Sequence, residues 1–130
     1  MHLHIFLAES DELAHARVAQ SYPVYHQNLA HLWRLHNVPF PNRDSSFGGD
    51  MHAAIAAQDL VIGSSETVAA HIQKLVNAAG LEYLIMSFAW VGLTHAESMA
   101  SVDLFARENL YGIDMRVGSL SSRVGAWRRN

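Results

Sequence analysis

The chain contains no cysteine, which excludes a disulfide framework, a thiolate metal site and a cysteine nucleophile. Its formal net charge of −3 is too small to indicate nucleic acid or an anionic membrane surface as a partner. No stretch approaches the roughly 20 apolar residues of a membrane span. The apolar start, residues 2–8, follows no Lys or Arg and precedes a run of acids, unlike a signal peptide. We therefore expect a cytoplasmic protein.

Proline is also sparse, with three residues, and half of the residues are hydrophobic, as in globular proteins. Three apolar segments have the character of strands, and each precedes a helical pattern: His2 to Ala8, Asp59 to Ile62 and Glu82 to Phe88. This alternation predicts an α/β fold of parallel β/α units, a partial TIM-barrel-like structure of about three strand–helix units. In such a fold we expect sequential strand order and right-handed crossovers, with all helices on one face. The third segment is almost continuously apolar and is expected to be covered on both faces.

The first helical pattern runs from Glu9 to about His36, and Ser10 is its expected N-cap. Pro23 interrupts this pattern, which predicts either two helices or one sharp kink, with Ser21 as a candidate second cap. The second half has an apolar stripe that we expect to be buried: Tyr25, Leu29, Leu32, Trp33 and His36.

Two further helices have clear end signals. One spans about Ser65 to Ala79 and is expected to stop at Gly80. The other begins with a capping box formed by Thr94 and Glu97 and runs to about Asn109. Their expected inward stripes are Val68, Ile72, Leu75 and Val76 in the first, and Met99, Val102, Phe105 and Ala106 in the second.

Two segments do not fit regular units. Residues 37–58 contain prolines and a glycine pair, and are expected to be a functional loop or disordered, with one helical turn near His52 to Ala57. We divide the chain into a domain at residues 1–110 and a tail at 111–130. The tail is expected to be poorly ordered; a docked functional arm is the alternative.

Four residues at strand ends are candidate cofactor contacts. Gly63 and Ser64 join a strand to a helix, where free N–H groups and the helix dipole bind phosphate; the alternative is that they only make the turn and cap the helix. Phe88 and Trp90 end the third strand, where aromatic rings wall a flavin or fill the core. We expect all four to line one concave rim, because parallel strands end on one side.

The sequence shows no pattern typical of a metal site or of a catalytic serine. The nine histidines show no metalloprotease spacing and no His pair with a carboxylate at ligand spacing. The serines follow no nucleophile-elbow pattern. We expect no metal cofactor.

The strand-end segments also resemble the luciferase-like flavin-dependent monooxygenases. The matching blocks are Phe6-Leu7-Ala8-Glu9-Ser10-Asp11-Glu12, Ile62-Gly63-Ser64-Ser65-Glu66-Thr67-Val68, and Phe88-Ala89-Trp90-Val91-Gly92-Leu93-Thr94-His95-Ala96-Glu97, with Leu104-Phe105-Ala106-Arg107-Glu108 after them. The resemblance covers about Leu3 to Asn109 and the C-terminal part of that family's barrel. Ser65 stands where the family usually has proline. A whole barrel needs roughly 250 residues, so the 130 residues here correspond to a fragment of one.

The resemblance implies an oxidoreductase that binds reduced FMN or a deazaflavin and uses oxygen to oxidise a small organic substrate. It implies that Gly63, Ser64, Phe88, Trp90 and the loop at Phe47-Gly48-Gly49 supply only part of the cofactor rim. The chain alone is then expected to be inactive. The alternative is a non-catalytic barrel remnant that acts as an oligomerising or partner-binding module. In either case unpaired strand edges predict a homo-oligomer.

Overall fold

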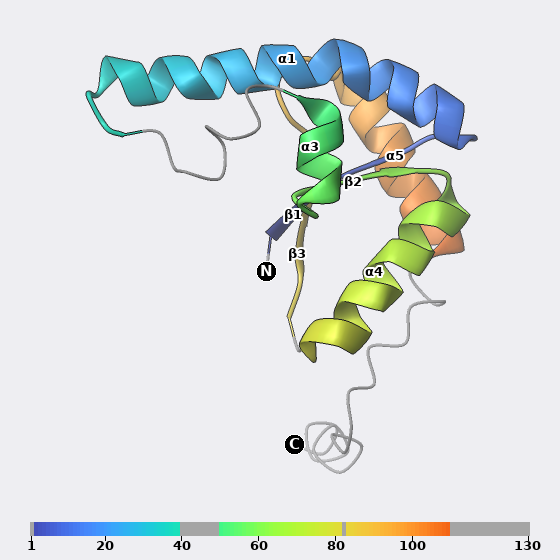
Figure 1. The fold of residues 1–130 in the computed structure, drawn as a ribbon. Coiled ribbons are helices and arrows are strands. Elements are labelled where there is room, and N and C mark those ends of the chain that lie inside the picture. The colour runs from blue at the N-terminus through green and yellow to red at the C-terminus, as the bar shows by residue number, and fades with distance from the viewer. Residues whose placement is uncertain (1, 40–49, 82, 110–130) are drawn as a thin grey trace, which may run out of the picture.

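The computed structural model describes residues 2–39, 50–81 and 83–109, which form three β/α units (Figure 1). The strands are β1 (His2–Leu7), β2 (Leu60–Gly63) and β3 (Ile85–Ser87). The helices are α1 (Asp11–Leu35), α3 (Met51–Ala56), α4 (Ser65–Ala79) and α5 (His95–Glu108). The expected tail and the loop at residues 47–49 lie outside the described residues. None of the described helices is long and apolar enough to cross a membrane.

The three strands form one open parallel sheet, which confirms the predicted α/β class. Their order is β2-β1-β3, so the expected sequential order is wrong. β1 is the central strand: Ile5 pairs with Val61 of β2, and Leu3 pairs with Met86 of β3. The chain therefore travels from β1 to one neighbour and then crosses β1 to reach the other. This arrangement is that of an open, doubly wound sheet rather than of consecutive barrel strands.

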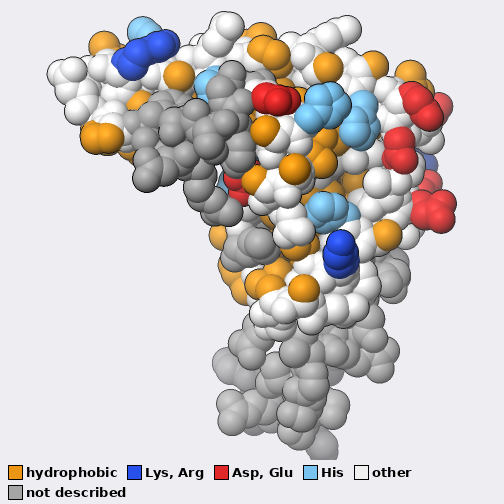
Figure 2. Space-filling model, in the orientation of Figure 1, with side chains coloured by type: hydrophobic (Ala, Val, Ile, Leu, Met, Phe, Trp, Pro, Cys, Tyr) orange, Lys and Arg blue, Asp and Glu red, His pale blue; other side chains and the backbone are white. Residues whose placement is uncertain are grey.

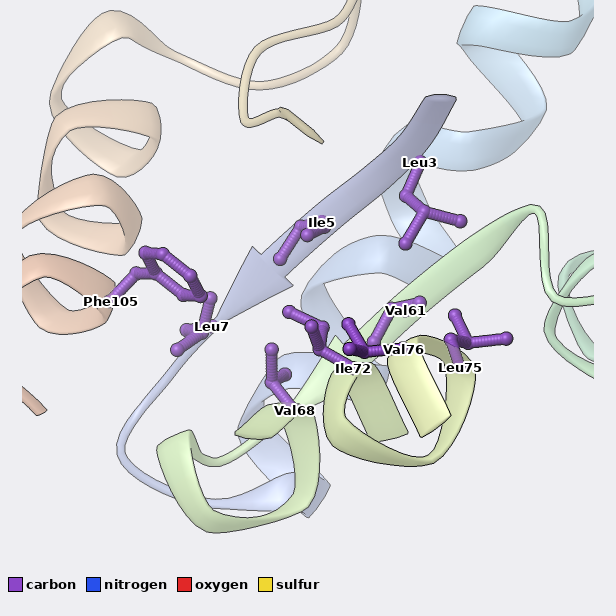
Figure 3. Close-up of a cluster of buried hydrophobic side chains, with 9 residues drawn as sticks. All are labelled: Leu3, Ile5, Leu7, Val61, Val68, Ile72, Leu75, Val76 and Phe105. Carbon is purple, nitrogen blue, oxygen red and sulfur yellow. The ribbon is translucent and has the colours of Figure 1, made fainter. Parts of the chain in front are cut away.

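Helices cover both faces of the sheet, and the expectation of a single helical face is also wrong. α1 and α3 pack on the face that carries Phe6, Leu60 and Ile62. α4 and α5 pack on the face that carries Leu3, Ile5 and Leu7 (Figure 3). The reversed direction of travel explains this: two crossovers of the same hand in opposite directions place their helices on opposite faces.

The core beneath α4 follows the sequence pattern closely. Its apolar stripe is buried against β1 and β2, with Phe105 of α5 at the edge of the cluster, and the predicted residues Val68, Ile72, Leu75 and Val76 are all buried (Figure 3). The helix also has the predicted bounds, because Ser64 caps its start and Gly80 ends it in a left-handed conformation with φ of 58°. The N-cap, the spacing of the apolar residues and the glycine that ends the helix all agree with the structure. The bounds and the buried face of α4 were therefore predictable from the local sequence.

α1 is one continuous helix through Pro23, so neither a break nor a second cap at Ser21 is present. Its first half packs on the sheet through Ala14, Val18, Ser21 and Tyr22, and Tyr25, further along, contacts His4 of β1. The second half projects past the sheet, as Figure 1 shows. The predicted buried stripe there is therefore wrong: Leu32 and His36 are exposed, while Tyr25, Leu29 and Trp33 are only partly buried.

α5 presents a different face from the one expected. Its buried residues are Ser98, Ser101 and Phe105, while Met99 and Ala106 are exposed. The predicted capping box of Thr94 and Glu97 is present. The buried face was misassigned because the prediction used only the spacing of apolar residues, and two of the buried residues are serines.

Candidate functional site at the carboxyl edge of the sheet

The carboxyl ends of the three parallel strands define the edge where α/β folds place their ligands. The segments that follow β1, β2 and β3 begin at Ala8, Ser64 and Phe88, and each leads to a helix. β1 lies between the other two strands, so the β2–α4 and β3–α5 junctions are not direct neighbours as expected. Two side chains of α1 bridge the gap instead, Asp11 to the first junction and Arg17 to the second.

Asp11 fills the N-terminus of α4. Its Oδ1 accepts a hydrogen bond from the Ser64 N–H at 2.6 Å, and its Oδ2 accepts one from the Thr67 hydroxyl at 2.9 Å. The Ser64 hydroxyl in turn accepts the Thr67 N–H as the helix cap. The hydrogen bonds from Ser64 and then Thr67 lower the pKa of Asp11. The α4 N-terminus thus binds a carboxylate of the same chain at the candidate phosphate site, and Ser64 caps the helix as the alternative interpretation had it.

Gly63 is required by this arrangement. Its φ of 152° lies in the region that favours glycine. A Cβ added there would lie 2.6 Å from Asp11 Oδ1 and 2.9 Å from the Thr67 methyl carbon. A side chain at this position would displace the Asp11 carboxylate, so Gly63 allows α1 and α4 to approach each other.

Arg17 ties α1 to the β3–α5 junction. Its guanidinium donates to both carboxylate oxygens of Glu97 and also to the Gly92 carbonyl at 2.7 Å. Glu97 additionally accepts the Thr94 N–H at 2.7 Å within the capping box. The hydrogen bonds from Arg17, and next that from Thr94, lower the pKa of Glu97 to about 2. The ion pair is therefore formed throughout the neutral range.

Trp90 lies on the α1 face of the sheet. Only 9% of it is exposed, its ring contacts Phe6 and His4, and its indole N–H donates to the Ser21 hydroxyl at 3.3 Å. The turn beyond it presses on the same helix, because a Cβ on Gly92 would lie 2.9 Å from the Ser21 carbonyl oxygen. Trp90 is therefore a core residue that anchors the junction to α1.

Phe88 lies on the opposite face. Its ring packs on Phe105 of α5 with 5.4 Å between centroids, beside the cluster beneath α4. The chain thus passes from one face of the sheet to the other between Phe88 and Trp90. The four predicted rim residues do not form one concave wall: Gly63 and Ser64 belong to the Asp11 contact, and the two aromatic rings fill separate cores.

Ser101 of α5 satisfies a backbone group at this edge. The Leu7 N–H donates to the Ser101 hydroxyl at 2.8 Å, and both groups are buried. β3 ends at Ser87, opposite His4, so it does not extend as far as Leu7. The hydroxyl therefore takes the place of the strand partner that the short β3 does not supply.

Sequence reasoning missed Arg17, Ser101 and the role of Asp11. The sequence places Asp11 in the first turn of α1, where the helix dipole alone is a sufficient reason for an acidic residue. Its partners lie more than 50 residues away, as the separations of 53 and 56 positions show. For Ser101 the sequence contained one signal. It lies four residues before the buried Phe105, so both residues are on the same face of the helix.

The residue types at this edge disfavour an anion near α4. Glu9, Asp11, Glu12 and Glu66 all belong to the first two junctions, and Figure 2 shows acidic side chains gathered by the start of α1 and α4. A phosphate there would have to displace Asp11 and approach three further carboxylates. The Gly63–Ser64 junction therefore does not fit a flavin phosphate in this arrangement. The segments after β1 and β3 remain, and there Ala89 and Val91 are exposed.

Two histidines lie in the first half of β1, beside the end of the short strand β3. The rings of His2 and His4 lie 4.9 Å apart, and the His2 Nε2 is 2.7 Å from the Ser87 hydroxyl. His4 also packs on Tyr25 and Trp90. Within residues 2–39, 50–81 and 83–109, no group of three or more His, Asp or Glu side chains is placed to hold a metal ion.

Comparison of the chain with family models and with curated proteins returned no match.

Proposed function

We propose that this chain is part of a flavin-dependent monooxygenase of the luciferase-like type, contributing to a flavin site at the carboxyl edge of its sheet. One observation carries the proposal. Three of the four sequence blocks that resemble that family are the three strand-to-helix junctions of the fold, and Asp11 and Arg17 connect these junctions to one another; the fourth block lies at the end of α5. The resemblance is therefore strongest in joined segments at the edge where α/β folds bind their ligands.

The flavin in this proposal lies over the ends of β1 and β3, not at the start of α4. Segment 8–10 follows β1 and segment 89–94 follows β3, and Val91 in the second segment is 52% exposed. Asp11 and Arg17 act as positioning residues, because each fixes a loop without being free to contact a ligand itself. The flavin would supply the redox chemistry, and the chain would hold and orient it.

Flavin binding by the purified chain tests this proposal. FMN, oxidised and then reduced under anaerobic conditions, is added to the protein, and retention through desalting is read from absorbance. We expect retained flavin for the parent. Val91→Asp places a negative charge beside the anionic cofactor and should weaken binding by roughly tenfold, equivalent to about 1.4 kcal/mol. The matched control is Leu35→Asp, at an exposed apolar position on the far end of α1, which should bind like the parent. No retention, or equal losses in both variants, contradicts the proposal.

A non-catalytic interaction module is the second candidate. The observation that favours it is the projecting half of α1, which carries exposed apolar side chains at Val24, Leu32 and Leu35, with Val38 beyond its end. Figure 2 shows apolar side chains along this projection. Under this candidate the chain binds no flavin and associates through the projecting helix. Loss of association in Leu35→Asp, together with no flavin retention, would support it over the first.

A further inference from the structure

We propose that His2 and His4 form a pH-sensitive contact: when these two histidines bind protons, β3 and the segment that carries Trp90 separate from β1, while β1 and β2 stay paired. The opening is local and is independent of flavin binding. It differs from a general loss of stability in acid because one strand separates before the others.

His2 and His4 lie side by side on one face of β1. Their ring centroids are 4.9 Å apart, and the His2 Nε2 lies 2.7 Å from the Ser87 hydroxyl of β3. The His4 ring packs on Tyr25 of α1 at 5.1 Å and on Trp90 beyond β3 at 5.8 Å, between centroids. This cluster therefore joins β1, β3 and α1 through two imidazoles, the side chains that change charge between about pH 5 and 8.

The surroundings of His4 favour its neutral form. Burial lowers the pKa of His4 most, and the neighbouring His2 lowers it further, because two positive charges so close together repel each other. Asp59, which precedes β2, acts in the opposite direction but does not reverse the shift. Tyr25 of α1 and Trp90 contribute aromatic rings and no carboxylate. A protonated His4 is therefore accommodated better where water reaches its ring.

The position of the two histidines makes β3 the strand that responds to their charge. β3 has three residues, and its pairs with β1 lie at His2, Leu3 and His4. The pairs of β1 with β2 run from His4 to Leu7, and all four β2 residues are buried. In β3, by contrast, Ile85 is 47% exposed. Elements with few buried contacts open at a lower free energy than the core, so β3 should open before β2.

The separation of β3 would bring water to both imidazoles and release Trp90 from the α1 face. Trp90 is 9% exposed in the closed arrangement, where its indole N–H donates to the Ser21 hydroxyl at 3.3 Å. The open state binds a proton that the closed state does not, since the folded pKa of His4 lies below its ordinary value of 6.5. The open population therefore rises by up to about tenfold for each pH unit below that value, until the folded pKa is reached.

Amide hydrogen exchange tests the opening, with the rates corrected for the intrinsic effect of pH. Between about pH 7.5 and about pH 5.5, the protection of residues 85–87 should fall by about tenfold more than that of residues 60–63 in β2. His4→Gln should remove this difference, and the matched control His31→Gln, at an exposed site of α1, should keep it. Equal losses of protection in β2 and β3 would overturn the proposal, as would a difference that His4→Gln leaves intact.

A second variant applies if circular dichroism shows that His4→Gln is unfolded. His2→Gln changes an exposed residue, removes the repelling charge and alters the contact with Ser87, while His4 stays in place. Without that repulsion the pKa of His4 lies closer to its ordinary value, so the loss of protection in β3 on acidification should be smaller than in the parent. An equal or larger loss in His2→Gln would overturn the proposal.

Discussion

At the scale of single residues, a few polar side chains close the carboxyl edge of this sheet. Ser101 accepts the Leu7 N–H, Asp11 accepts the Ser64 N–H, and Arg17 joins Glu97 to the Gly92 carbonyl. Each of these bonds satisfies a group that the short strands and helix ends leave unpaired. The edge therefore depends on long-range side-chain contacts more than on strand pairing.

Ser101→Ala should lower the free energy of unfolding by about 1–3 kcal/mol, because the buried Leu7 N–H loses its acceptor. Ser98→Ala, at another buried serine of α5, is the control and should change stability by less than about 1 kcal/mol. Chemical denaturation of both variants measures the difference. Equal losses would show that the hydroxyl bond to β1 contributes nothing specific.

Asp11→Ala should lower the thermal midpoint at neutral pH, whereas Glu12→Ala at the exposed neighbouring position should not. Hydrogen bonds from Ser64 and Thr67 lower the pKa of Asp11, so the stability it contributes is present above the pKa of the unfolded chain. That stability is lost as the pH falls through the folded pKa. Midpoints measured from neutral to strongly acid pH should therefore converge for Asp11→Ala and the parent. A constant gap across the range would contradict the assigned contact.

At the scale of elements, local signals predicted α4 almost completely and α1 only in part. In α4 the cap, the apolar period and the stop all coincide with the buried face. In α1 the apolar residues beyond Pro23 have the period of a buried face, yet past Tyr25 they lie largely exposed or only partly buried. Whether such an apolar stripe is covered depends on the tertiary arrangement. The spacing of apolar residues along a helix does not contain that information. The same limit applies to β3, whose apolar run gives no sign of its exposed side.

Pro23→Ala should stabilise the fold by about 1–2 kcal/mol. Proline inside a helix removes the hydrogen bond to the residue four before it, at a cost of about 3 kcal/mol, and part of the gain is offset by a freer unfolded chain. Val24→Ala, at the next exposed position, should shift stability by no more than about 0.5 kcal/mol. Urea unfolding gives both values. A destabilised Pro23→Ala would mean that the proline is needed for the course of α1.

At the scale of the whole molecule, the class was predictable and the topology was not. Alternating apolar segments and helical patterns predict parallel β/α units, and the structure confirms them. The order β2-β1-β3 and the helices on both faces depend on which neighbour each crossover selects, and no local pattern encodes that choice. The prediction of a single rim was wrong for the same reason. Because β1 separates β2 from β3, Ser64 contacts Asp11 while Trp90 contacts Ser21.

The fold should also lose stability in mildly acid solution. Burial, and then the nearby His2, lower the pKa of His4 below its ordinary value of 6.5, while Asp59 acts in the opposite direction. The folded chain therefore binds fewer protons than the unfolded one, and stability falls as the pH drops below about 6.5. His4→Gln should flatten this slope and His31→Gln, at an exposed site, should not. Unfolding free energies from pH 8 to pH 5 measure it; an unchanged slope in His4→Gln would contradict the assignment.

The proposed flavin site lies at the carboxyl edge between β1 and β3. The most direct measurement is a titration of FMN, oxidised and then reduced under anaerobic conditions, into isotopically labelled protein, followed by amide chemical shifts. We predict shifts for the amides of Glu9, Ser10, Val91 and Leu93, and none for Gly80 and Leu81 at the opposite end of the sheet. A spectrum that does not change, or changes centred on Gly80, would contradict the claim.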